Sequence, residues 1–310
     1  MPATVPGGIE GGLMLLRANA EGAAAKEPRM TILKNASLAL ALAGFAAVSG
    51  AQAQGFAGSV EGGFQMTDRT NTANNIVNSP YFGGYLAGYG SLGLGRVALA
   101  FDGRGEFTYD RGYDNVLATG PLHTGVVGAR AGTRLGNIYV GAFAGIGFFD
   151  GRDSDQPMRG SIYGIETEYF LPGGGSLYAQ LGQARAIGSD AADNEFDGID
   201  YKIGALFPVN AKSTVEISAE HAISSQCFQD CGDLGRNVVF GLEGVRRLTD
   251  RIDLVGTIDY AHVTTNAKAT HATSMDVFVG IRVPLGARPT SALRTPMAAF
   301  QAASWMHPTD

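Results

Sequence analysis

Beyond its first 53 positions, the 310-residue sequence lacks any run of about 18 apolar residues, the length that a membrane-spanning helix needs. It is also poor in charge, with 17% Asp, Glu, Lys and Arg and a formal net charge of −6. A mildly acidic chain gives no indication of nucleic acid as a partner. The mean hydropathy is +0.03. Two classes fit these values: a soluble β protein, and a barrel whose apolar residues alternate with polar ones.

Cysteine is nearly absent, and the two that occur, Cys227 and Cys231, lie four positions apart in one polar segment. In an exported protein they could close a small loop disulfide. Two thiols without a nearby His or third Cys supply only half of a zinc site. The acidic segments around Asp153 and Asp190 lack the spacing of a calcium loop, so we interpret their acids as solvated and predict no metal site.

Glycine, in contrast, is abundant. The chain has 45 glycines, a share about twice the usual average. They follow no collagen period and come with no Ser or Pro bias, so this glycine content indicates neither a fibre nor a disordered chain.

Residues 30–53 have the parts of a secretory signal peptide. Lys34 gives a basic start, Ala36 to Gly50 form an apolar stretch, and Ala51-Gln52-Ala53 is a cleavage site of small residues. We therefore predict export.

The mature chain is predicted to begin near Gln54, and residues 1–29 are expected to be a dispensable extension or an over-extended start. Removing residues 1–53 leaves 19 Lys and Arg against 26 Asp and Glu, a net charge of −7.

From Gln54 onward, apolar and polar residues alternate with period two in segments of about ten residues. This length matches a tilted membrane strand. No segment of comparable length shows a convincing helical stripe. The twelve segments run over 56–66, 82–92, 95–109, 121–134, 137–149, 159–171, 175–186, 198–208, 212–223, 236–248, 251–263 and 273–285.

The connections between these segments alternate between long and short. The polar stretch 67–80 is followed by the turn at Leu94-Gly95, and the stretch 110–120 by the turn at Leu135-Gly136. Outer-membrane barrels have short periplasmic turns, longer extracellular loops and an even strand number. The sequence therefore predicts an all-β fold: a single antiparallel up-and-down transmembrane barrel of about 12 strands over residues 54–286.

Most segments have an apolar and a polar parity; segment 251–263, for example, sets Leu254 and Ile258 against Asp253 and Asp259. Segments 82–92, 121–134 and 137–149 are less clear, because Gly and Ala occur on both of their faces. A Lys or Arg facing lipid at mid-membrane costs about 2–4 kcal/mol, so the charges are predicted to face the lumen. The predicted lumen-lining residues are Glu61, Arg96, Asp102, Arg104, Glu106, Glu166, Glu168, Asp200, Lys202, Glu216, Glu220, Glu243, Arg247, Asp253, Asp259, Asp276 and Arg282.

This set contains twelve acids and five bases, and two interpretations of the interior remain open. In the first, the charged groups pair across strands and fill a narrow interior with side chains. In the second, twelve strands leave a thin aqueous channel whose acidic walls favour cations or neutral polar solutes.

The signal peptide, the alternating strands and the loop pattern together resemble bacterial outer-membrane β-barrel proteins of the porin type, over residues 54–286. Gly280, followed by Val283 and Leu285, matches the usual C-terminal assembly signal, although Pro284 intrudes and the chain does not end on an aromatic residue. The resemblance implies the barrel-assembly machinery, outer-membrane lipids and lipopolysaccharide as partners. Residues 287–310 show no strand alternation and are expected to be a periplasmic or disordered tail.

Motifs for catalysis are weak. Gly88 to Gly93 matches the G-x-G-x-x-G dinucleotide pattern, but a strand rather than a helix is predicted to follow. Twelve-stranded outer-membrane phospholipases use Ser and His near the outer rim, which raises Ser224, His221 and His262 as candidates. No G-x-S-x-G motif accompanies them, so we predict neither an enzyme nor a cofactor.

The sequence therefore predicts an outer-membrane, porin-like channel for passive diffusion of small polar or cationic solutes through an acidic lumen. The alternatives are a non-conducting structural or adhesion barrel that acts through its extracellular loops, and a lipid hydrolase.

Overall fold

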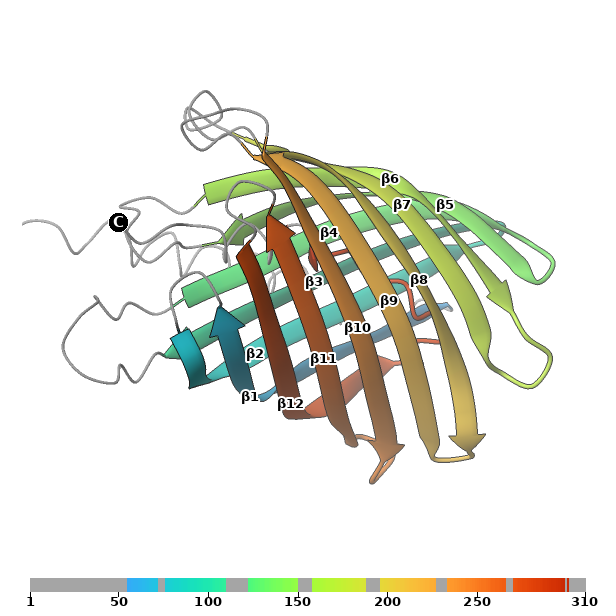
Figure 1. Ribbon diagram of the computed structural model, residues 1–310. Coiled ribbons are helices and arrows are strands. Elements are labelled where there is room, and N and C mark those ends of the chain that lie inside the picture. The colour runs from blue at the N-terminus through green and yellow to red at the C-terminus, as the bar shows by residue number, and fades with distance from the viewer. Residues whose placement is uncertain are drawn as a thin grey trace, which may run out of the picture. The chain divides into compact units, whose positions relative to one another are not determined.

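The computed structural model describes residues 55–71, 76–109, 122–149, 158–187, 196–226, 233–265, 270–298 and 300, all within the compact unit Ser49–Asp310. They form one barrel of β-strands (Figure 1). No helix in these ranges is long and apolar enough to cross a membrane. The strands are β1 (Phe56–Asn71), β2 (Ile76–Leu94), β3 (Val97–Tyr109), β4 (Leu122–Leu135), β5 (Ile138–Phe149), β6 (Met158–Phe170), β7 (Ser176–Ala186), β8 (Phe196–Asn210), β9 (Ser213–Gln226), β10 (Asp233–Arg247), β11 (Asp253–Thr265) and β12 (Thr270–Gly286).

The barrel is closed by pairing between its first and last strands. β1 pairs antiparallel with β12 from Gly58↔Leu285 to Asn71↔Ala272, and the other strands pair with their neighbours in sequence. Closure leaves no unpaired strand edge, which is the condition for a sheet to cross hydrocarbon. The twelve-stranded, all-antiparallel barrel predicted from the sequence is therefore confirmed.

Some strands are longer than the alternation indicates. β1 continues to Asn71 and β2 begins at Ile76, inside the stretch 67–80 that was expected to be a loop. Backbone pairing continues there after the apolar alternation has ended. Measured between strand ends, the last connection, 266–269, is shorter than the turn 248–252 that precedes it, so the strict alternation of loop lengths expected from the sequence is wrong in this detail.

Two of the short turns depend on glycine. Gly95, between β2 and β3, has φ of 67°, and Gly136, between β4 and β5, has φ of 63°. This left-handed conformation is costly for residues with a Cβ atom. The two glycines therefore determine where these hairpins reverse.

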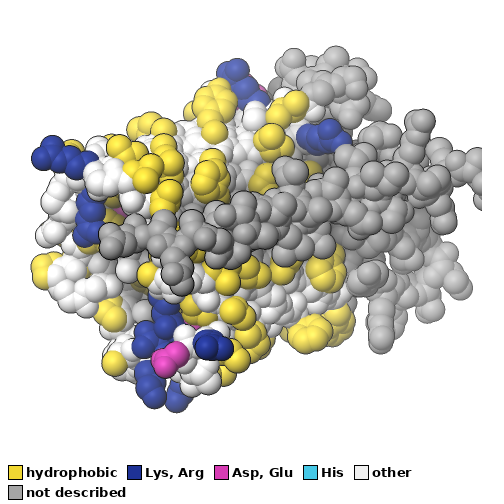
Figure 2. Space-filling view, turned by 180° about the vertical axis from the view of Figure 1, so that it is seen from behind, with side chains coloured by type: hydrophobic (Ala, Val, Ile, Leu, Met, Phe, Trp, Pro, Cys, Tyr) yellow, Lys and Arg dark blue, Asp and Glu magenta, His cyan; other side chains and the backbone are white. Residues whose placement is uncertain are grey.

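On the strands whose alternation is clear in the sequence, the two parities separate as expected. On β11, Leu254 and Ile258 are exposed on the outside, whereas Asp253, Val255 and Thr257 are buried inside. Phe64 on β1 is 82% exposed, which is typical of a side chain that faces lipid rather than a protein core. Figure 2 shows apolar side chains over much of the outer surface.

The chain re-enters the barrel after its last strand. Gly286 has φ of 78°, and Ala287 then pairs in parallel with Ala57. The Ala287 N–H donates to the Phe56 carbonyl (3.2 Å), and the Gly58 N–H donates to the Ala287 carbonyl (3.1 Å). Residues 287–298 and 300, which we call the C-terminal plug, therefore begin by running parallel to β1.

This course corrects the expectation of a periplasmic or disordered tail for residues 287–298 and 300, while residues 301–310 lie outside the described part. The expectation failed because the plug has no strand alternation of its own. Its position depends on groups contributed by many strands, described below.

We predict that Gly164→Ala on β6 lowers the free energy of unfolding by about 1–3 kcal/mol, because an added Cβ would lie 2.6 Å from the Gly182 Cα on β7. Urea titration of the folded barrel in bilayers measures this change. The matched control is Gly105→Ala on β3, where an added Cβ meets nothing within 4 Å. Equal destabilisation by both variants would contradict the close approach of β6 and β7.

Candidate functional site

The interior of the barrel is the candidate site. Of the seventeen predicted residues, eight acids are buried inside the barrel: Glu61, Asp102, Glu166, Glu168, Asp200, Glu220, Asp253 and Asp276. Seven others are partly buried on inward-facing positions: Arg104, Glu106, Lys202, Glu216, Glu243, Asp259 and Arg282. Arg247 lies at the end of β10 and is partly buried, and Arg96 lies exposed in the turn between β2 and β3.

Part of this charge is neutralised across strands. Arg282 on β12 contacts Glu61 on β1 at 2.6 Å and Glu243 on β10 at 2.9 Å. Tyr85 on β2 donates its hydroxyl hydrogen to Glu61 (2.7 Å). Lys202 on β8 lies 3.3 Å from Glu220 on β9. These bridges join neighbouring strands and also, through Arg282, strands on both sides of β12.

A second buried network was missed by the sequence analysis. Arg130 on β4 donates to Asp102 (2.6 Å) and lies 3.5 Å from Glu166, which also accepts from Tyr139 (3.0 Å) and Gln180 (3.0 Å). β4 and β5 are rich in Gly and Ala on both faces, so their apolar parity is unclear in the sequence. The charge of Arg130 was the signal that could have placed it inside, because a charged side chain that faces lipid is costly.

The C-terminal plug supplies hydrogen-bond donors to several acids of the wall, including Asp102, which also accepts from Arg130. Asp102 accepts from the main-chain N–H of Thr295 (2.8 Å) and from its hydroxyl (3.1 Å). Glu168, which has no exposed surface, accepts from the Ser291 hydroxyl (2.6 Å) and the Ala292 N–H (3.2 Å). Buried carboxylates are costly without such partners. The plug therefore supplies hydrogen-bond partners that these buried carboxylates of the barrel wall need.

Two further groups of hydrogen bonds hold the plug near its two ends. Near its start, Arg288 donates to Asp253 (3.0 Å) and to the carbonyls of Thr249 and Asp250, in the turn between β10 and β11. Farther along, Glu220 accepts from the main-chain N–H groups of Met297 (3.0 Å) and Ala298 (2.6 Å).

The Ala298 carbonyl accepts from the Asn237 side chain on β10 (2.9 Å). Asp253 lies at the first residue of β11, at the end with the short turns, whereas Asn237 lies in the opposite half of the barrel. The plug thus extends through much of the lumen.

Apolar side chains anchor the plug at two points. Leu293 is 1% exposed and packs in a cluster with Tyr139 and Tyr178. Phe300 is fully buried in a cluster that includes Phe143 and Ile162.

Inward-facing glycines leave the room for these anchors. A Cβ on Gly147 or Gly160 would lie 2.6 or 2.7 Å from the Phe300 ring, and a Cβ on Gly128 would overlap the Thr295 side chain. Part of the unusual glycine content therefore shapes the groove in which the plug lies.

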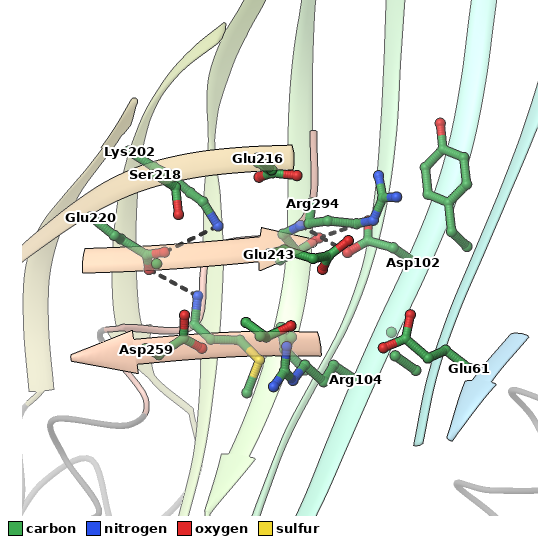
Figure 3. Close-up of a pocket in the computed structure, with 18 of the residues that line it drawn as sticks. Glu61, Asp102, Arg104, Lys202, Glu216, Ser218, Glu220, Glu243, Asp259 and Arg294 are labelled. Atoms are coloured by element: carbon green, nitrogen blue, oxygen red, sulfur yellow. Dashed lines mark hydrogen bonds and ion pairs between the residues drawn. The ribbon is translucent and has the colours of Figure 1, made fainter. Parts of the chain in front are cut away.

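A polar cavity of about 160 Å³ remains between the plug and the wall. A cavity needs only roughly 10–15 Å³ to hold a water molecule, so this one has room for solvent or a small solute. Figure 3 shows Lys202 and Glu220 on one side of it and Arg294 with Asp102 on the other. Its other charged lining residues are Glu61, Arg104, Glu216, Glu243, Asp259 and Arg282.

Among the described side chains, those of the remaining candidates form no catalytic cluster. His221 and His262 point outward; His221 stacks on Tyr201 (6.3 Å between ring centroids) and His262 on His271 (5.9 Å). Ser224 lies in β9, and Gly88 to Gly93 lie in β2, which is followed by β3. The described residues contain no group of three or more potential metal ligands. Cys227, Cys231 and the loop acids near Asp153 and Asp190 lie outside the described residues.

We predict that Phe300→Ala releases the plug. Loss of a buried Phe side chain costs about 3–5 kcal/mol, and each 1.4 kcal/mol shifts an equilibrium tenfold. Trypsin cleavage after Arg294, which lies inside the barrel in the native protein, is expected to accelerate more than tenfold. Phe64→Ala, the same change at an outward-facing position, is the control and is expected to leave the cleavage rate unchanged. A similar rate in all three proteins would show that Phe300 does not anchor the plug.

No protein-family model and no curated protein matches the sequence. Among solved structures, the chain is similar to an outer membrane channel from Pseudomonas putida F1, with a TM-score of 0.57, 12% identity, and coverage of 76% of this chain and 97% of that one. It also matches the translocator domain of the autotransporter NalP from Neisseria meningitidis, with a TM-score of 0.45, 12% identity, and 82% and 97% coverage. The first likeness shows that the chain shares the β-barrel fold of that structure.

Proposed function

We propose that this protein is an outer-membrane channel for small polar solutes, with a preference for cations, and that the C-terminal plug holds it closed. The observation that carries the proposal is the polarity of the interior. A barrel that served only as a scaffold would have no need of buried carboxylates, which are costly to hold inside a protein. In this chain, ten or more ionisable side chains line the lumen.

The contacts that hold the plug in the lumen are noncovalent, so closure of the channel can be reversed. The plug is joined to the barrel by hydrogen bonds, one ion pair and two apolar anchors, and it is covalently attached only at Gly286. When it leaves, water replaces its N–H donors at Asp102, Glu168 and Glu220. The lumen then becomes a continuous polar passage.

Cation preference follows from the charges that the plug carries. Arg288 and Arg294 lie in the plug, so its displacement removes two positive charges from the lumen. The excess of inward-facing carboxylates over bases in the lumen then widens, and the bases that stay on the wall include Arg104, Arg130, Lys202 and Arg282. Rings of acidic side chains favour cations in channels.

The location supports the same proposal. The outward-facing apolar surface fits a bilayer, and export through the signal peptide at residues 30–53 would deliver the chain to the outer membrane. We propose that the barrel-assembly machinery inserts it there.

The plug itself favours one second candidate. A lumen filled by its own chain also fits a non-conducting barrel that acts through its extracellular loops. Conductance decides between the two functions, because that barrel would stay closed even when the plug is weakened.

We predict that Leu293→Ala/Phe300→Ala raises the open probability of single channels in planar bilayers at least tenfold over the native protein, because both anchors of the plug are lost. The matched control is Phe64→Ala/Leu254→Ala, which removes an aromatic and an aliphatic side chain from the outer surface. Absence of conductance in a folded, heat-modifiable Leu293→Ala/Phe300→Ala barrel would overturn the channel proposal.

A disulfide tests whether movement of the plug is the opening step. In a Cys227→Ser/Cys231→Ser background, Gly128→Cys/Thr295→Cys would place two Cβ atoms about 2.9 Å apart, a small shift from disulfide geometry. The oxidised barrel is expected to stay closed and to conduct after reduction. Equal conductance in the two redox states would show that ions pass without displacement of the plug.

Selectivity provides a separate prediction. In the Leu293→Ala/Phe300→Ala barrel, the reversal potential in a KCl gradient is expected to show cation preference, and Glu243→Gln/Asp259→Asn is expected to reduce it, because both acids line the cavity. Thr214→Ser/Thr257→Ser provides a conservative control on β9 and β11. A preference for chloride would contradict the acidic lumen as the selective element.

A further inference from the structure

The end of the barrel with the short turns carries a group of exposed bases that neither the lumen nor the plug uses. Four of the five short turns contribute to it, and all five turns are described. Figure 2 shows Lys and Arg side chains gathered at the left-hand end of the molecule. We call this group the basic rim; its members, all exposed, are Arg96, Arg134, Lys212, Arg246 and Arg251.

The bases of the rim are not held by acids of the barrel. Among the described residues, none of the five forms an ion pair. Arg134 donates to the Gly136 carbonyl in its own turn and lies over the Phe170 ring. Asp250 is the one exposed acid in the five turns. The rim is therefore positive on a chain whose overall charge is negative.

The same turns expose aliphatic side chains next to the bases. Leu94 precedes Arg96, Leu135 follows Arg134, Val209 precedes Lys212, and Leu248 lies between Arg246 and Arg251. Each of these four aliphatic side chains is more than half exposed. A turn with an apolar tip and a long basic side chain matches the boundary of a bilayer, where the apolar part enters the acyl region and the charge reaches the phosphates.

We propose that the basic rim binds the phosphates of anionic phospholipids in the periplasmic leaflet of the membrane. The rim is spread over turns from eight different strands around the barrel, as a leaflet that surrounds the barrel requires. A soluble acidic protein would instead require bases concentrated on one side, and it would not need the exposed aliphatic side chains. The proposal rests on the membrane location of the barrel and does not depend on conduction.

Stabilisation by lipid tests the proposal, because a ligand that binds the folded state raises its apparent stability. The full-length chain is folded into vesicles of phosphatidylcholine with increasing fractions of phosphatidylglycerol. The midpoint temperature of the heat-induced gel shift is then measured. We expect the midpoint to rise with phosphatidylglycerol, and the rise to shrink in 0.5 M salt, where the Debye length is only about 4 Å.

The variant Arg96→Gln/Arg134→Gln/Lys212→Gln/Arg246→Gln/Arg251→Gln is expected to lose the dependence on phosphatidylglycerol. Its midpoint in pure phosphatidylcholine is expected to match that of the native protein, which shows that the variant folds. The matched control is Arg159→Gln/Arg185→Gln/Arg236→Gln, which removes exposed bases from the opposite end of the barrel and is expected to respond like the native protein.

An equal response of the rim variant to phosphatidylglycerol would overturn the proposal. So would a rise in the native midpoint by soluble polyglutamate as large as that by phosphatidylglycerol, because it would show that the rim recognises any polyanion. The experiment measures stability and not conductance. Binding of lipid by the basic rim can therefore be confirmed in a barrel that conducts no ions, and it can be refuted in a barrel that conducts.

Discussion

Main-chain hydrogen bonding in a medium without water is the constraint on which this structure depends. Each backbone N–H and C=O that faces hydrocarbon needs a protein partner, and pairing of β1 with β12 provides the last row of partners. Once the sheet is closed, alternate residues face opposite sides. Apolar side chains such as Phe64 then face lipid, and charged ones such as Asp102 are brought together in the interior.

The concentration of charge inside the barrel has a further consequence. Acids outnumber bases on the wall, and cross-strand pairs such as Arg282 with Glu61 satisfy only some of them. Main-chain N–H groups of the plug supply partners to Asp102, Glu168 and Glu220 without adding further acids. The plug and the acidic wall are therefore complementary, and the interior is both filled and polar. Under the proposed function, the two sequence-based interpretations describe two states of the same barrel. The packed interior is the barrel with its plug in place, and the aqueous channel is the barrel with its plug displaced.

Strand number and strand direction were predictable because each depends on local alternation and on closure. The ends of β1 and β2 were not, because backbone pairing continues beyond the apolar alternation that revealed the strands. Arg130 and Tyr139 were missed because β4 and β5 have small residues on both faces. Sequence alternation is informative only where one face differs from the other in polarity.

The sequence by itself determined the twelve-stranded barrel, since period-two alternation and turn residues such as Gly95 and Gly136 act over a few neighbouring positions. Only the tertiary structure decided the position of residues 287–300. Their partners include Asp102, Glu168, Glu220 and Asn237, which lie on β3, β6, β9 and β10. These four residues are between 61 and 193 positions away from the plug residues that they contact. These partners come together only when the barrel has closed, so no local pattern in the segment could reveal that it lies inside.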